Sequence, residues 1–299
     1  MTHTPLPKTS GPAQSALEAA GITHLEQLAE HSEAEIAKLH GMGPKALRIL
    51  KETLAEHGLR FKEGVQSELS AAGFLMQLKS HASLAQQQAY ERYFPGQSQE
   101  FIGVRMGQVF ALAKAHSQMP LAEIETLLES DIREARAGAV SIMEKSVRGK
   151  KTSEERRKAL YELYLRRHAR INTWDLVDLG AQHVVGAWLA DKPRDILYQL
   201  AASDFWPERR SALVACFAFV RRGELDDALK LAEMLAEDPE EYVQKAAGWL
   251  LRSVGDADRP RLLAFLQQHA ARMRRPMLRA AIEKLDKAER ARWLAALDE

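Results

Sequence analysis

The residues best suited to chemistry lie in one short stretch of the chain, which contains an indole at Trp174 and carboxylates at Asp175 and Asp178. Asn172 or Thr173 is a suitable helix cap just before them. Trp174 and Asp178 then lie one helical turn apart on the same face. A carboxylate near a helix start is favoured by the helix dipole, so Asp178 is expected to stay ionised unless it is deeply buried. The stretch is either a candidate site or an ordinary buried tryptophan at an acidic helix start, and residues elsewhere must decide.

Other reactive residue types are sparse. Cys216 is the only cysteine and lies in an apolar run, which favours a core thiol over a nucleophile and excludes an intramolecular disulfide. The histidines are scattered, with no His-Glu-x-x-His pair on one helix face. The sequence therefore predicts no bound metal and no cofactor.

Composition indicates a globular protein. Of the 299 residues, 46% are hydrophobic and 28% are charged, and this length fits one large or two smaller domains. No apolar run approaches the roughly 20 residues of a membrane span, and the start of the chain lacks a signal peptide's apolar core. We expect a cytoplasmic protein without membrane contact. The formal net charge of +1 predicts no partner by itself, so the distribution of charge matters.

The elements that must position these residues are predicted to be helices throughout, so the expected fold class is all-α. Residues 1–10, rich in Thr, Pro and Ser, are predicted to form a flexible tail. Short amphipathic helices are expected in a small domain at residues 11–62, followed by a polar linker at residues 63–70. Residues 71–299 read as helix after helix, separated by short breakers.

The small domain contains a Gly-x-Gly turn, Gly41 and Gly43, that leads into a helix start. This segment resembles the hairpin of helix-hairpin-helix domains. Glycines let a backbone approach a phosphate closely, and the N–H groups of the helix start can hold that anion, with Lys45 and Arg48 adding positive charge. Glutamates offset the cations of the block. Contact with the DNA backbone and a structural or protein-binding role are therefore both open.

A weak internal repeat runs through the larger part of the chain. Asp131, Asp204 and Asp238 each precede a basic residue and an alanine at similar distances. Asp204 and Asp238 are 34 residues apart, and Asp131 and Asp204 are 73 apart, about two such periods. The shorter spacing falls in the range of helical-pair repeats, on the order of 20–50 residues. This pattern predicts a HEAT-like α-solenoid with a concave surface that can grip an extended partner.

Cations cluster just before Trp174, since Lys and Arg far outnumber Glu between Arg148 and Arg170. If they converge on the concave face, they form the electrostatic footprint of a phosphate backbone; otherwise they form a solvated surface. Trp206 lies among apolar neighbours and is expected in the core, whereas Trp249 follows small residues and could face either core or groove. The candidate DNA-binding residues in this part are Arg148, Lys150, Lys151, Arg166, Arg167, Arg170, Arg210, Lys245 and Arg252.

Three segments taken together, residues 174–178, 206–212 and 244–252, resemble the AlkD-type DNA alkylation-repair glycosylases in order and spacing. The resemblance covers roughly residues 71–285. Residues 101–105 also look like that family's early glycine-containing helix start. The N-terminal domain lies outside the minimal family pattern.

The resemblance implies a HEAT-like solenoid that binds duplex DNA in its groove and removes cationic N3- or N7-alkylated purines. Position by position, Asp178 matches the catalytic carboxylate of the family. Trp174 and Trp249 match the aromatic pair that cradles the deoxyribose of the lesion. Arg209 matches the groove arginine, which would hold a flanking phosphate, and the adjacent Arg210 is the alternative.

These residue types suit that chemistry. An alkylated purine already carries positive charge, so no general acid need protonate the leaving base. A fixed carboxylate at Asp178 can stabilise the oxocarbenium-like sugar and orient water. The resemblance further implies that the base need not be flipped into a pocket, unlike the substrates of many glycosylases.

Two other classes of function remain open. A non-catalytic DNA-binding or scaffold protein could keep the solenoid without turnover, and an adaptor could bind proteins instead. The combination of Trp174, Asp178, Arg209 and Trp249 favours the metal-free, monofunctional glycosylase, because a scaffold does not require this set. We expect a monomer that acts on duplex DNA containing alkylated bases.

Overall fold

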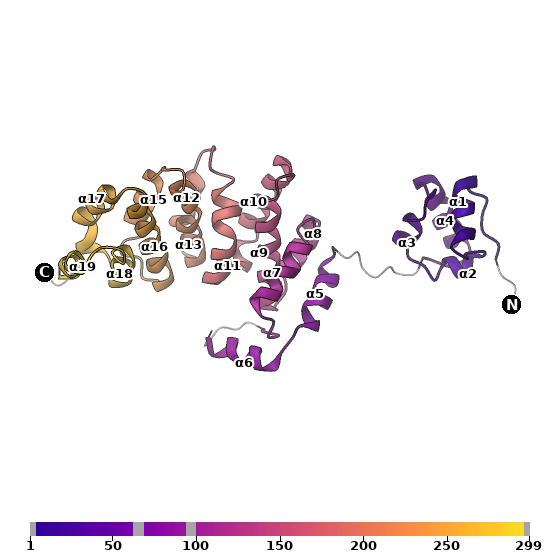
Figure 1. The fold of residues 1–299 in the computed structure, drawn as a ribbon, viewed down its shortest axis with the longest axis horizontal. Helices are drawn as coiled ribbons and strands as arrows, with labels where there is room; N and C mark the ends of the chain where they lie inside the picture. The colour runs from indigo at the N-terminus through magenta and orange to yellow at the C-terminus, as the bar shows by residue number, and fades with distance from the viewer. Residues whose placement is uncertain (1–3, 62–68, 94–99, 296–299) are drawn as a thin grey trace. The chain divides into compact units, whose positions relative to one another are not determined.

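The computed structural model describes residues 4–61, 69–93 and 100–295, and within these ranges it contains helices and no β-strand (Figure 1). The all-α prediction is confirmed for this part of the chain. The chain divides into two compact units, Met1–Gly73 and Phe74–Glu299. Most of the predicted linker, residues 63–68, lies outside the described residues.

Four short helices form the N-terminal unit: α1 (Gly11–Ala19), α2 (Leu25–Leu28), α3 (Glu33–Ala37) and α4 (Pro44–Glu56). A capping box starts α3, because the Ser32 side chain accepts the Glu35 N–H while the Glu35 carboxylate accepts the Ser32 N–H. The apolar faces of the helices close on one core, made of Leu17, Ile22, Leu25, Leu28, Ile36, Leu50, Leu54 and Phe61.

Residues 4–10 are attached to this unit. The Thr4 hydroxyl donates to the Glu26 carboxylate at 2.7 Å, and the Leu25 N–H donates to the Thr4 carbonyl at 2.9 Å. Leu6 packs against the apolar core. The predicted flexible tail is therefore wrong from Thr4 onward, because these contacts offset the entropy lost in ordering the segment. Residues 1–3 lie outside the described part.

Two layers of helices build the larger unit (Figure 1). In the first layer each helix contacts the next along the row. This layer consists of α7 (Met106–Ala115), α9 (Arg133–Val147), α11 (Trp174–Gly180), α13 (Trp206–Ala215), α16 (Glu241–Ala257) and α18 (Arg275–Ala281). The helix α9 is the centre of the unit, since almost all of its side chains are buried.

The second layer packs against the first, each helix contacting at least one member of that row. It consists of α8 (Leu121–Leu128), α10 (Glu154–Arg166), α12 (Asp195–Ala201), α15 (Asp226–Met234) and α17 (Arg259–His269). Short elements connect the layers: the 3-10 turns η1 (His168–Arg170) and η3 (Ala270–Arg272), the π-helical turn η2 (Ala181–Gly186), and α14 (Phe217–Val220), with α19 (Lys287–Ala295) after α18. Among the described residues, no helix is both long and apolar enough to cross a membrane.

The helix α6 (Leu84–Tyr93) follows α5 (Ala71–Ser80) and has no buried residue. The loop before α7 packs against the first turn of α6 and holds it in place. Gly103 has a φ of +77°, and a Cβ at this position would collide with the Ser83 carbonyl at the start of α6. The buried Glu134 carboxylate of α9 accepts the Gly103 N–H at 2.8 Å and the Val104 N–H at 3.2 Å. Glu134 therefore ties the glycine-containing loop, and α6 with it, to the centre of the unit.

Candidate active site

Asp178 and Arg210 form a two-pronged ion pair between α11 and α13. Arg210 Nε donates to Asp178 Oδ1 at 3.0 Å, and Nη2 donates to Oδ2 at 2.7 Å. Arg210 also donates to the carbonyl of Tyr242 at the start of α16. The side chain of Arg210 is 6% exposed and that of Asp178 is 23% exposed. The arginine is thus locked between three neighbouring helices, while its carboxylate partner still reaches solvent.

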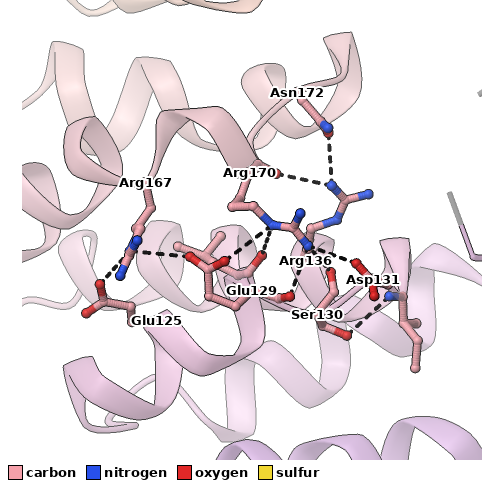
Figure 2. Close-up of polar contacts among 10 residues, drawn as sticks. Glu125, Glu129, Ser130, Asp131, Arg136, Arg167, Arg170 and Asn172 are labelled. Atoms are coloured by element: carbon pink, nitrogen blue, oxygen red, sulfur yellow. Dashed lines mark hydrogen bonds and ion pairs between the residues drawn. The ribbon is translucent and has the colours of Figure 1, made fainter. Parts of the chain in front are cut away.

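The start of α11 differs in detail from the expected cap. Thr173 occupies the cap position, but its hydroxyl makes no capping hydrogen bond. The side-chain oxygen of Asn172 accepts from Arg136 Nη1 at 3.0 Å, so it serves α9 instead (Figure 2). Trp174 and Asp178 nevertheless lie one turn apart in the helix, as the spacing predicted.

Burial raises the pKa of Asp178 above its usual 3.8, and the hydrogen bonds and charge of Arg210 oppose that rise. The net direction of the pKa shift is upward, so the ion pair with Arg210 offsets only part of the rise that burial causes. Because each effect has a separate cause, removing Arg210 would leave only the upward shift.

Further aromatic rings lie next to Trp174. The ring of Tyr242 stacks on that of Trp174 at a centroid distance of 6.4 Å and on that of Trp206 at 5.3 Å. The ring of Tyr93, which is largely exposed, also lies 6.4 Å from that of Trp174. Trp206 is half-buried in this stack, so its expected place in the core is wrong. It is the first residue of α13, and its ring faces Tyr242 of α16.

A cavity of about 530 Å³ opens beside Asp178. Its walls come from α6, α7, α9 and α11, and most of the lining is apolar or aromatic. The lining residues are Gln86, Ala89, Tyr90, Tyr93, Met106, Phe110, Arg133, Trp174, Asp175, Asp178 and Leu179. The volume lies within the range of small-molecule sites, roughly 300–1,000 Å³.

A second ion pair lies in the same cavity wall. Arg133 of α9 pairs with Asp175 of α11, and both side chains are largely buried, at 4% and 12% exposure. The Arg133 guanidinium lies 5.9 Å from the centre of the Tyr90 ring and donates to the sulfur of Met106 at 3.1 Å. This pair joins α11 to α9 and neutralises the guanidinium that would otherwise repel a cation in the cavity.

The neighbouring Arg209 points elsewhere. Its Nε donates to the Asp238 carboxylate at 2.6 Å, and its Nη1 donates to the carbonyl of Ser203 at 2.9 Å. Its side chain is 13% exposed. Arg209 and Arg210, the two candidates for the groove arginine, therefore point in different directions from α13. The arginine that contacts Asp178 is Arg210.

Trp249 is half-buried in α16 and packs on the Phe217 ring at a centroid distance of 4.3 Å. It follows Tyr242 by two helical turns on the same face, which corresponds to about 10 Å along the helix axis. Asp178 lines the cavity and Trp249 does not. The structure therefore places Trp249 on the face of α16 that carries Tyr242, but outside the cavity lining.

Much of the basic run before Trp174 holds the framework together (Figure 2). Arg167 pairs with Glu125 at 2.6 Å and with Glu129 at 3.3 Å. Arg170 donates to the Leu128 carbonyl at 3.1 Å and to the Glu129 carbonyl at 2.9 Å. These carbonyls end α8 and have no helical partner of their own, so Arg170 caps that helix.

Other predicted DNA-binding cations also have partners within the unit. The pairs are Arg148 with Glu144 at 2.5 Å, Arg166 with Glu125 at 3.1 Å, Lys245 with Glu241 at 2.6 Å, and Arg252 with Glu283. Lys150 and Lys151 are exposed and form no ion pair with the described residues. They remain the cations of this run that are least engaged by the protein itself.

In the N-terminal unit, the Gly-x-Gly turn does precede a helix. Gly41 has a φ of +92°, and a Cβ there would crowd Pro12 of α1. Gly43 is extended and caps α4. Lys45 and Arg48 on that helix are exposed. Gly41 therefore has a conformational and packing reason to be glycine that is independent of any ligand.

The residue types of a metal site do not gather in the described part of the chain. No group of three or more His, Cys, Asp or Glu side chains there could hold a metal ion. Cys216 is buried, and burial raises the pKa of its thiol. It lies in the core, as its apolar neighbours predicted.

Comparison with known proteins identifies the family of the chain and a solved structure with a similar fold. The model of the DNA alkylation repair enzyme family matches residues 74–285, and the chain belongs to this family. The larger unit is similar to a solved structure described as a predicted DNA alkylation repair enzyme from Enterococcus faecalis, with a TM-score of 0.57, 19% identity, and coverage of 69% of this chain and 98% of that chain. This similarity shows a shared fold. No curated protein matches the chain.

Proposed function

We propose that the chain is a monofunctional DNA glycosylase that excises cationic N3- or N7-alkylated purines from duplex DNA. One observation carries the proposal: Asp178 is held by Arg210 and still exposes 23% of its side chain, on the wall of a cavity lined by aromatic rings. A fixed, accessible carboxylate beside aromatic faces is suited to stabilising a cationic transition state.

In the proposed reaction, the bond between C1′ of the deoxyribose and the purine nitrogen breaks, and its electron pair goes to the base. The base is already a cation, so it leaves as a neutral molecule without taking a proton from the protein. Asp178 stabilises the oxocarbenium character left on the sugar. Water then adds to C1′ and loses one proton, which completes the hydrolysis.

The other site residues follow from their contacts. Arg210 positions Asp178 through their direct ion pair. This pairing supports Arg210 as the groove arginine in preference to Arg209, whose guanidinium pairs with Asp238. Trp174 lines the cavity and would face the sugar. The resemblance pairs Trp249 with it, and the stacking of Tyr242 on Trp174 brings that face of α16 toward the site.

The two layers of helices support a HEAT-like solenoid for the larger unit, acting as a monomer on duplex DNA in the cytoplasm. Lys150 and Lys151 are the cations best placed by their exposure to meet phosphates. The N-terminal unit would serve as a helix-hairpin-helix domain that adds contact with the DNA backbone through the turn at Gly41 and Gly43 and the nearby Lys45 and Arg48.

The test is release of 7-methylguanine and 3-methyladenine from methylated duplex DNA, without added metal, by the wild-type chain and by Asp178→Asn. We expect the variant to lose at least about a hundredfold in single-turnover rate, as when one transition-state interaction is removed, while duplex affinity is retained. Asp191→Asn is the matched control, because Asp191 is exposed and pairs with Lys192 away from the cavity. Full activity in Asp178→Asn would sink the proposal.

The measurement also separates the other class of function. If neither protein releases a base and both bind duplex DNA with strong salt dependence, the chain is a non-catalytic DNA-binding or scaffold protein.

A further inference from the structure

Tyr242, the second residue of α16, lies between two indoles from the two preceding helices of the first layer. Its ring stacks on that of Trp174 of α11 at a centroid distance of 6.4 Å and an interplanar angle of 17°. It stacks on that of Trp206 of α13 at 5.3 Å and 26°. Both pairs lie in the distance range of favourable aromatic contacts. All three side chains are half-buried, so part of each still reaches solvent.

The backbone of Tyr242 contacts the arginine that holds the carboxylate. Its carbonyl accepts a hydrogen bond from Arg210, whose side chain is 6% exposed. The same guanidinium donates to both oxygens of Asp178. Tyr242 is therefore linked to Asp178 through its backbone and to the indole of Trp174 through its ring. These are the carboxylate and the indole that the proposed reaction places at the sugar.

The other ring beside Trp174 offers a weaker restraint. Tyr93 is 65% exposed, and its ring is tilted by 57° from the indole. An exposed side chain keeps much of its rotamer freedom, so it does little to fix a neighbour. Trp174 also lines the cavity, so part of its surface is not covered by other side chains. Of the two neighbouring rings, Tyr242 is the better restrained, because Trp206 covers its other side.

We infer that Tyr242 is a positioning residue that holds the indole of Trp174 at a fixed angle to the Asp178 carboxylate. An indole attracts a cation through its face, so this attraction depends on how the ring is oriented. A group that is already oriented toward developing charge needs no reorganisation during the reaction. The inference rests on the proposed function for the part that Trp174 takes in the reaction. The Tyr242 ring acts through Trp174 and takes no chemical step itself.

The first test compares two replacements in the full chain. Tyr242→Leu removes the ring and keeps an apolar side chain, whereas Tyr242→Phe keeps the ring. We expect the single-turnover rate of base release from methylated duplex DNA to fall by about two- to thirtyfold in Tyr242→Leu, the range for one cation–aromatic interaction, and to recover in Tyr242→Phe. Tyr161→Leu is the matched control, since Tyr161 pairs with the Trp188 ring at 5.8 Å outside the cavity lining, and its rate should not change.

A double-mutant cycle separates positioning from a general loss of structure. If Tyr242 acts through Trp174, then Tyr242→Leu should cause no further loss of rate once Trp174→Ala is present. Losses that multiply in the double variant would show that Tyr242 acts independently of the indole, and would overturn the inference.

The second test needs no DNA. The five tryptophans are labelled as 5-fluorotryptophan, and the fluorine NMR resonance of Trp174 is identified by its loss in Trp174→Phe. This resonance should move in Tyr242→Leu and stay in place in Tyr161→Leu. An unmoved resonance in Tyr242→Leu overturns the positioning role even if methylated DNA is processed. If the wild-type chain releases no base, the proposed function fails, and the resonance still decides whether Tyr242 holds Trp174.

Discussion

Two regions of the larger unit use arginine in opposite ways. At the edge formed by α8 and α10, Arg167 and Arg170 make many contacts with carboxylates and helix-end carbonyls (Figure 2). In the cavity region, a single arginine, Arg210, holds Asp178 and leaves that carboxylate accessible. In the first region the guanidinium charges are paired within the protein and stabilise the packing of the helices. In the second region the carboxylate charge of Asp178 stays accessible to solvent.

The contrast between these regions shows that the density of charge along a sequence does not locate a site. The run from Arg148 to Arg170 is the most basic part of the chain, yet Arg148, Arg166, Arg167 and Arg170 all meet acidic or carbonyl oxygens of the protein. The candidate site is set instead by one pair of residues on adjacent helices. Substitutions in each region test this division between framework and site.

Arg210→Gln should reduce activity more than any other substitution considered below. Without the guanidinium, Asp178 loses its position and the group that opposes its upward pKa shift. We expect kcat/KM for base release to fall by about a hundredfold or more. In the proposed mechanism only the ionised carboxylate is active, so activity should be lost as the pH falls through the pKa of Asp178. This acid limb should move to higher pH in the variant.

Arg209→Gln is the control for this prediction. Arg209 pairs with Asp238 and not with Asp178, so its variant should keep the acid limb of the wild-type chain. An unchanged limb in Arg210→Gln, or the same displacement in both variants, would contradict the assignment of Arg210 as the positioning residue.

A smaller effect is expected in the framework. Arg170→Met removes the charged donor from the carbonyls that end α8. The free energy of unfolding should fall by about 2 kcal/mol, the typical contribution of hydrogen bonds to a charged group, as measured by urea denaturation. The salt dependence of duplex binding should not change, and a marked change would move Arg170 from the framework to the DNA-binding surface.

The smallest effect concerns the exposed lysines. In the double variant Lys150→Ala, Lys151→Ala, the slope of log affinity for duplex DNA against log salt should decrease by roughly one for each phosphate that the protein no longer neutralises. Arg166→Ala should change the slope less, because Arg166 shares its charge with Glu125. Equal changes of the slope in the two proteins would contradict the distinction between cations that are paired within the protein and cations that are not.

The helical class and the turn that carries Trp174 and Asp178 could be predicted because both depend on local spacing. The choice between Arg209 and Arg210 could not, since adjacent helical residues point about 100° apart and only the packed register of α13 decides which meets Asp178. The position of Tyr93 in the cavity lining also could not be predicted from the sequence, because it depends on how α6 packs against the rest of the unit.

Trp206 shows a related limit. An apolar sequence context predicts burial, but its position at the first turn of α13 places the ring against Tyr242 at the edge of the helical layer. Thr4 shows the same limit at the chain start, where composition predicted a tail and hydrogen bonds to Glu26 hold the residue.

The helix α6, which forms one wall of the cavity, has no buried residue. Displacing α6 breaks the hydrogen bond from the Tyr90 hydroxyl to the Val104 carbonyl at 3.1 Å but exposes no fully buried side chain, so we expect it to cost less than unfolding the unit. Arg133 on another wall belongs to α9, whose side chains are almost all buried, so we expect that side to be more rigid. The cavity thus has one compliant side and one rigid side. We therefore expect displacement of α6, and not the resting volume of about 530 Å³, to set the upper size of a group accepted beside Asp178.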